Sequence, residues 1–311
     1  MSRDIVIAVP CWGKHYRDLF LGPVLRSHRA AIDALQREYR GSIAVRYVVQ
    51  TDDPVAVATA LAGYEMTLVP PPTEIRARNP MRAMATAHAH GIQMARTNER
   101  VVLLNADIMV STEAFVAMER QFRSGKKCIV TCGTRTLPGF LGPPGPLRSR
   151  QLHAWSMRHP HPITMSCFWG SGKCHLPWGV YFREGKSIIL RAFHLHPFAV
   201  VKDRPLKFDG TIDMDLADSY QHDEIHVVTD IDEMAIVEMS PKTKGLGDNP
   251  WNIDVGQILA WALRGARPMH WWNFRHRICV QGDPDSVKED IEVADEVLRM
   301  SPFAEAIDAS V

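Results

Sequence analysis

The strongest constraint on the fold is the apolar run at residues 101–104, which leads directly into the segment Asn105-Ala106-Asp107. Four consecutive apolar residues without polar alternation indicate a strand that is buried on both faces, as strands of parallel sheets usually are. A residue that follows such a strand lies at the edge of the sheet. The run therefore predicts an α/β sheet with the carboxylate of Asp107 at its edge.

Similar apolar runs alternate with helical patterns in the first part of the chain. Strands are predicted over residues 5–9, 43–50, 65–69, 101–104 and 127–132. Helices are predicted over residues 22–39, 55–61 and 80–96 and from residue 111 onwards. Asn79 suits the N-cap of the third helix, and Pro80 suits its first turn. This alternation predicts a mainly parallel, Rossmann-like sheet with helices on both faces.

The pattern changes at a segment rich in proline and glycine, residues 138–150, which predicts a loop between two halves, 1–137 and 151–311. The second half has shorter strand-like runs, at residues 179–182, 187–191, 199–201, 225–228 and 234–238. Helical patterns follow at residues 251–264 and 286–299. We expect an α+β portion here that packs on the same sheet.

Composition narrows the functional classes. The 311 residues include 46% hydrophobic and 23% charged residues, which is typical of a globular protein. The net charge of +1 gives no support to nucleic-acid binding. Six cysteines without a CxxC pair predict reduced, mostly buried thiols in a cytoplasmic protein. No apolar stretch approaches the roughly 20 residues that a transmembrane helix needs, and peripheral association with the inner face of a membrane stays open.

Polar side chains follow three of the predicted strands. Ligands of parallel sheets bind outside the carboxyl ends of the strands. The residues at these ends are Cys11, Trp12, Lys14 and His15, preceded by Pro10, after the first strand, Thr51, Asp52 and Asp53 after the second, and Asn105 and Asp107 after the fourth. Hard oxygen ligands suit Mg²⁺ or Mn²⁺, which commonly keep substrate phosphates as ligands. The alternative for Asp107 is a structural role as the cap of a turn or helix.

Two arginines precede the helix at residue 80. Arginine matches the geometry of phosphate and stays charged, so Arg76 or Arg78 could clamp a diphosphate near the helix N-terminus. The alternative is a solvated basic loop.

A second group of polar residues lies in the later half. His194 and His196 are two apart in an extended segment, as are Asp213 and Asp215. Residues at this spacing face the same side of a strand, so the histidines could bind one metal ion together. The alternative is a hydrogen-bonded structural role for all four.

Residues 4–135 resemble a GT-A glycosyltransferase of the family-2 type. That family carries an Asp-x-Asp motif at a strand end, after a helix that ends in a run similar to residues 89–95, Ala-His-Gly-Ile-Gln-Met-Ala. Here the motif corresponds to Asn105-Ala106-Asp107, so that Asn105 stands in place of the first acid and brings no charge. The resemblance implies a GT-A-like fold whose strand ends at residues 9–12 and 50–53 hold the nucleotide base and ribose.

The resemblance also implies an activity. A Mn²⁺- or Mg²⁺-dependent glycosyltransferase would move a sugar from a nucleotide-diphosphate donor to an acceptor that is a glycan, a lipid-linked group or a small molecule. A late His or Asp often completes the metal shell in that family, which would add His194 and His196 to Asp107. Asp213 or Asp215 would be the base if the reaction inverts configuration. The aromatic planes of Trp169, Trp178, Trp271 and Trp272 could stack on a sugar ring, or could belong to the core.

Three other functions remain open. A nucleotidyltransferase would also be α/β and Mg²⁺-dependent, although it usually has a Gly-rich first loop, whereas residues 10–14 contain one glycine. A non-catalytic binding protein of the same fold would be compatible with the uncharged Asn105. A metallohydrolase centred on His194 and His196 would not need the nucleotide-type first half.

Overall fold

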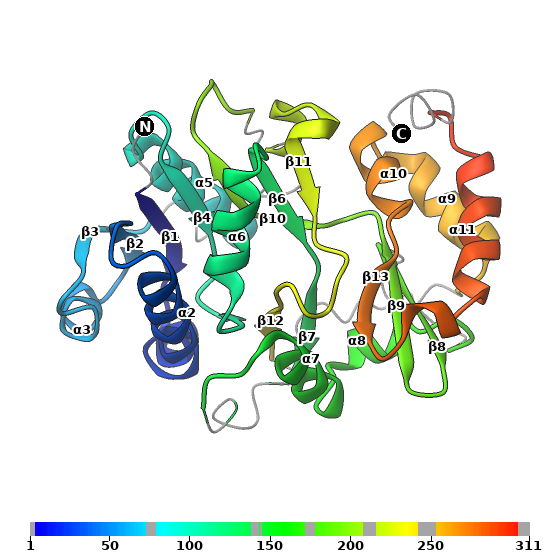
Figure 1. The fold of residues 1–311 in the computed structure, drawn as a ribbon, viewed down its shortest axis with the longest axis horizontal. Helices are drawn as coiled ribbons and strands as arrows, with labels where there is room; N and C mark the ends of the chain where they lie inside the picture. Colours follow the sequence, from blue (N-terminus) through cyan, green and yellow to red (C-terminus); the bar gives the residue numbers. More distant parts are fainter. Residues whose placement is uncertain are drawn as a thin grey trace. The chain divides into compact units, whose positions relative to one another are not determined.

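The computed structural model describes residues 4–72, 79–137, 143, 145–171, 178–207, 216–241 and 253–303 (Figure 1). The chain forms two compact units and passes between them more than once. Unit 1 takes the described residues of Met1–Val130, Phe140–Arg148 and His196–His226, and unit 2 takes those of Thr131–Gly139, Ser149–Leu195 and Val227–Val311. The units therefore divide the chain at more points than the loop at residues 138–150.

Unit 1 is built on a seven-stranded sheet with the order β11-β6-β10-β4-β1-β2-β3. Its strands are β1 Ile5–Cys11, β2 Val45–Thr51, β3 Glu65–Val69, β4 Arg100–Leu103, β6 Cys128–Thr131, β10 His196–Val201 and β11 Ile225–Val227. The strands β1 to β4 pair in parallel, whereas β10 pairs with β4 in the antiparallel direction. The predicted α/β class is confirmed, and the sheet is mixed.

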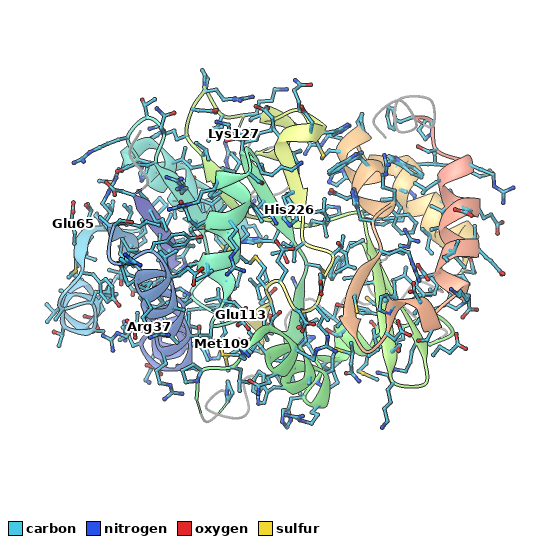
Figure 2. All side chains as sticks on the ribbon, in the orientation of Figure 1. Arg37, Glu65, Met109, Glu113, Lys127 and His226 are labelled. Atoms are coloured by element: carbon cyan, nitrogen blue, oxygen red, sulfur yellow. The ribbon has the colours of Figure 1, made fainter. Side chains whose placement is uncertain are left out.

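The two edge strands of this sheet come from distant parts of the chain. Glu65 begins β3, which is the strand at one edge, and His226 lies in β11 at the other edge (Figure 2).

All seven residues of β1 are buried, because the strand has a neighbour on each side and helices on both faces. The continuous apolar run of β1 therefore reflects its central place in the sheet.

Helices of unit 1 surround the sheet, together with the short strand β5 Ile108–Val110. The helices are α1 Lys14–Leu19, α2 Leu25–Glu38, α3 Pro54–Ala60, α5 Pro80–Met94, α6 Ala114–Arg123 and two short 3₁₀ turns, Ala217–Ser219 and His222–Glu224. A π-helical turn at Phe20–Val24 separates α1 from α2, with non-helical backbone angles at Gly22. The helix predicted from residue 22 therefore begins at Leu25, after Pro23, whose ring removes a backbone donor.

Opposite faces of the sheet carry different helices (Figure 1). The ring of Tyr47 in β2 stacks on His28 of α2, with 6.4 Å between the ring centroids. Tyr47 pairs with Ile7 of β1, so the next residue, Ala8, points to the other face, where it meets Gly91 of α5. The prediction that helices cover both faces is therefore confirmed for α2 and α5.

Unit 2 combines short strands with helices. Its strands are β7 Gly133–Thr136, β8 Gly179–Glu184, β9 Ser187–Ala192, β12 Ile236–Met239 and β13 Ile278–Gln281. Its helices are α7 Ser149–Arg158, α8 Pro162–Ser166, α9 Val255–Gly265, α10 Pro268–Phe274, α11 Glu289–Arg299 and a 3₁₀ turn at Pro284–Ser286. β8, β9 and β13 form an antiparallel sheet, and β7 pairs with β12 in parallel.

A buried ion-pair network ties α11 to the antiparallel sheet of unit 2. Asp290 is fully buried, and its Oδ2 accepts hydrogen bonds from Arg191 of β9 and Arg277, each at 2.9 Å. A buried carboxylate needs such partners, because losing one leaves an uncompensated charge in the interior. This network therefore fixes where α11 packs.

Two expectations from composition concern the whole chain. Five of the six cysteines fall among the described residues, and all five are free and buried, namely Cys11, Cys128, Cys132, Cys167 and Cys279. Burial raises the pKa of the Cys11 thiol to about 12. Within the described ranges, no helix is both long and apolar enough to cross a membrane.

Gly91 sets the distance between α5 and β1. A Cβ placed on Gly91 would lie 2.3 Å from the Cβ of Ala8. We expect Gly91→Ala to lower the free energy of unfolding by about 1–3 kcal/mol, because the strand backbone cannot move away inside a packed sheet. Urea denaturation followed by circular dichroism measures this change.

Gly265→Ala is the matched control, since no atom lies within 4 Å of a Cβ at this helical position. Without a clash, alanine should keep or raise stability, by up to about 1 kcal/mol. Equal effects of the two substitutions would contradict a close contact at Gly91.

Candidate functional site

The sheet of unit 1 has a topological switch point between β1 and β4. From β1, the chain adds β2 and β3 on one side of the sheet and then crosses to add β4 on the other side. At such a point the loops after the two central strands separate, which leaves room for a ligand outside their carboxyl ends. Cys11 pairs with Thr51, and Ala8 with Leu103, so the three predicted strand ends lie side by side.

The ends of β1 and β2 are joined by polar contacts. The backbone N–H of Gly13 donates to Oδ2 of Asp52 at 2.9 Å. The guanidinium of Arg17, in α1, lies 3.5 Å from carboxylate oxygens of both Asp52 and Asp53. Asp52 is exposed. The predicted residues Pro10, Trp12, Thr51, Asp52 and Asp53 are thus brought to one edge of the sheet.

Asp53 also has a structural role. Its Oδ1 accepts from the backbone N–H of Ala56 at 3.1 Å, which caps the N-terminus of α3. Its own N–H donates to Oγ1 of Thr51 at 3.1 Å. The carboxylate of Asp53 is therefore committed to the start of a helix, whereas that of Asp52 faces the loop after β1.

Asn105 and Asp107 follow β4, the strand that pairs with β1. The N–H of Leu104 still donates to the carbonyl of Ala8 at 3.2 Å, and the chain then turns, with the N–H of Ile108 donating to the carbonyl of Asn105 at 3.0 Å. Asp107 is 2% exposed. Oδ1 of Asn105 is buried and has no hydrogen-bond partner. The turn therefore contains one buried carboxylate and one unsatisfied amide oxygen.

Three histidines hydrogen-bond to backbone carbonyls around this turn. Nε2 of His196 lies 2.7 Å from the carbonyl oxygen of Leu103. Nε2 of His88 lies 3.3 Å from that of Leu104, and Nε2 of His28 lies 3.3 Å from that of Ile108. Since a carbonyl only accepts, each of these nitrogens carries the proton.

Burial keeps two of these histidines neutral. Burial is the main cause that lowers the pKa of His28 to about 4 and that of His88 to about 3. The Nδ1 atoms of both rings are buried and have no hydrogen-bond partner. With Nε2 protonated, each Nδ1 is left as an unpaired acceptor.

His194 has different surroundings. It belongs to unit 2, whereas His196 belongs to unit 1. The ring of His194 stacks on His270, with 4.4 Å between centroids, and also contacts Trp261 at 5.4 Å. Within the part of the chain that the structure describes, no group of three or more His, Cys, Asp or Glu side chains could hold a metal ion.

Four predicted site residues lie outside the described residues. These are Arg76 and Arg78, predicted to clamp a diphosphate, and Asp213 and Asp215, predicted to act in catalysis. Their predicted roles stay predictions.

The predicted sugar-stacking tryptophans separate into two pairs. Trp271 is fully buried and Trp272 is 6% exposed, so for these two the core alternative is the one that the structure supports. Trp169 and Trp178 are half-buried. Nε1 of Trp169 donates to Oε1 of Glu289 at 2.7 Å.

Sequence reasoning missed part of this site. His88 and His90 are two apart on α5 and therefore face different sides of the helix. His90 contacts Gln50 of β2, with 2.7 Å between Nδ1 and Nε2, while His88 reaches the end of β4. His88 is three residues before Gly91, which touches β1, so both residues lie on the buried side of α5.

Comparison with known proteins adds no relative. No protein-family model matches the chain, and no curated protein matches it.

The cap at Asp53 can be tested separately from any ligand. We expect Asp53→Ala to lower the free energy of unfolding by about 1 kcal/mol, because the Ala56 N–H loses its acceptor. Asp53→Ser should keep most of the stability, since serine also caps helices. Thermal and urea denaturation of both variants measure the difference, and equal losses would argue against a capping role.

The buried histidines predict a stability that depends on pH. The unfolded chain binds a proton at each histidine near pH 6.5, but folded His28 binds one only near pH 4 and His88 near pH 3. Between pH 6.5 and pH 4 the unfolded state binds more protons than the folded state. The free energy of unfolding should therefore fall as the pH falls from 6.5 towards 4.

Each such histidine contributes a slope of at most about 1.4 kcal/mol per pH unit. His153, whose pKa burial lowers to about 4, allows the slope to be tested away from the site. Urea denaturation at a series of pH values should show a shallower slope for His153→Leu than for the wild type. A stability that is flat from pH 6.5 to 4 would contradict the prediction.

Proposed function

We propose that the protein is a GT-A-like glycosyltransferase that takes a sugar from a nucleotide-diphosphate donor in the presence of Mn²⁺ or Mg²⁺. The observation that carries the proposal is the position of the Asn105-Ala106-Asp107 turn. It lies at the switch point of the sheet, one strand away from the end of β1 and two from that of β2. The resemblance in sequence assigns the nucleotide base and ribose to the ends of β1 and β2, and the cation to the turn after β4.

The residues of the turn fit a hard cation. The Asn105 Oδ1 is a buried oxygen without a hydrogen-bond donor, and Asp107 supplies a buried carboxylate. Such oxygens are what Mg²⁺ and Mn²⁺ prefer, and buried carboxylates are stabilised by partners or by metal ions. His196 donates through Nε2 to the carbonyl of Leu103, so Nε2 itself is not available to a metal ion. A bound cation would neutralise negative charge on the leaving diphosphate.

The nucleoside would lie across the ends of β1 and β2. Asp52 is exposed, and it contacts the backbone N–H of Gly13 and the guanidinium of Arg17. Its carboxylate could accept hydrogen bonds from a base or a ribose. Asp53 supports this site indirectly, since it caps α3 and keeps the loop after β2 in one conformation.

The rest of the predicted mechanism depends on residues outside the described ranges. Arg76 and Arg78 would bind the diphosphate, and Asp213 or Asp215 would accept the proton of the acceptor hydroxyl if the transfer inverts configuration. The acceptor is a glycan, a lipid-linked group or a small molecule.

Ligand-induced stabilisation tests the proposal. UDP-, GDP- and CMP-linked sugars would be added with and without Mn²⁺ to the wild type and to Asp107→Ala. We expect one nucleotide sugar with Mn²⁺ to stabilise the wild type by roughly 2–4 kcal/mol at saturation, because a ligand that binds the folded state shifts the unfolding equilibrium. Asp107→Ala should lose the part of the shift that depends on Mn²⁺.

The matched control is Asp33→Ala, which removes an exposed carboxylate on α2 and should respond as the wild type does. The absence of a shift with every nucleotide would refute the transferase. A shift with metal alone that His194→Ala abolishes and Asp107→Ala keeps would favour a metallohydrolase instead. Nucleotide binding without release of the sugar onto any acceptor or water would favour a binding protein.

A further inference from the structure

We propose that His28, His88 and His196 act together as positioning residues that hold the Asn105-Ala106-Asp107 turn in place before any ligand binds. We call these three side chains the histidine clamp. The purpose of the clamp rests on the proposed function, in which Asp107 meets a cation. The effect of the clamp on the turn does not rest on the proposed function and can be measured without a ligand.

The clamp comes from three separate elements. His196 begins β10, the strand beside β4, whereas His88 lies in α5 and His28 lies in α2. The helices α5 and α2 cover opposite faces of the sheet, as the contacts of Ala8 and Tyr47 show. The turn is therefore held from both faces of the sheet and from the neighbouring strand.

The three hydrogen bonds bracket the turn. His196 and His88 bind the carbonyls of Leu103 and Leu104, just before Asn105, and His28 binds that of Ile108, just after Asp107. Carbonyls at the end of a strand lose their partners in the ladder and must find others when buried. In this protein side chains from distant elements provide these partners, so a movement of either end of the turn breaks a hydrogen bond to α2, α5 or β10 unless that element moves with it.

Histidine suits this role chemically. At His28 and His88 the neutral ring donates one N–H to a carbonyl without placing a positive charge next to the proposed cation. Lysine or arginine could donate as well, but would repel a cation and compete for the carboxylate of Asp107. Removal of groups that orient the ligands of a metal ion in this way typically weakens metal binding by 10–100-fold.

Amide hydrogen exchange tests whether the clamp holds the turn. His88→Leu and His28→Leu remove the donors, whereas His88→Gln and His28→Gln keep an N–H at a similar reach. Exchange would be followed at three amides, those of Leu104, Ile108 and Val110, which donate to the carbonyl of Ala8, the carbonyl of Asn105 and Oγ of Ser27. We expect exchange there to become at least ten-fold faster in the leucine variants and to return towards the wild-type rate in the glutamine variants.

The control is a buried histidine with the same type of bond elsewhere. Nε2 of His161, in unit 2, lies 2.9 Å from the carbonyl oxygen of Pro241, and His161 is fully buried. His161→Leu should lower stability without a selective effect on residues 104–110. His88→Asn, whose shorter amide cannot reach Leu104, replaces His88→Leu if leucine prevents folding.

Binding of Mn²⁺ and UDP would be measured on the same variants by calorimetry. We expect the leucine variants to bind Mn²⁺ with UDP at least ten-fold more weakly than the glutamine variants. Unchanged exchange at residues 104–110 would overturn the clamp even if nucleotide binds. Faster exchange with unchanged Mn²⁺ affinity would overturn its positioning role. If the wild type binds no nucleotide, the proposed function fails, while faster exchange in the leucine variants alone still supports the clamp.

Discussion

The antiparallel pairing of β10 with β4 is the interaction on which the rest of unit 1 depends. Ala199 of β10 pairs with Val102 of β4, and β10 in turn connects β4 to β6 and β11 in the sheet. The pairing places His196 beside the carbonyl of Leu103. A single strand thus completes the hydrogen bonding of β4 and supplies one of the side chains around the turn at its end.

Much of the fold of the first half was predictable, because buried strands there read as continuous apolar runs. The run at residues 65–69 predicted β3 at its observed bounds, and Asn79 caps α5 through a bond to the N–H of Arg82. The direction of β10 was not predictable, since a buried run reads the same in either direction. Short elements were missed because they carry too few residues to show a period, namely α1, β5, β7, α8, α10 and β13. The ten-residue helix α7 was missed as well.

The candidate site was predictable only where side chains follow strands. Thr51, Asp52 and Asn105 could be placed at one sheet edge because parallel strands end together. The partners of the turn were not predictable in the same way. His28, His88 and His196 are far apart in the sequence, and only the packing of two helices and a late strand brings them to the same turn. Tertiary contacts of this kind leave no local pattern.

β10 comes much later in the sequence than β4, the strand with which it pairs, and this order has a consequence for the synthesis of the protein. A ribosome completes β1 to β4 long before it reaches His196. Until then β4 exposes an unpaired apolar edge, which is the kind of surface on which chains aggregate. Because contacts between distant parts of a chain form slowly, unit 1 should depend on protection by chaperones during synthesis, and a fragment that ends before β10 would keep that edge open permanently.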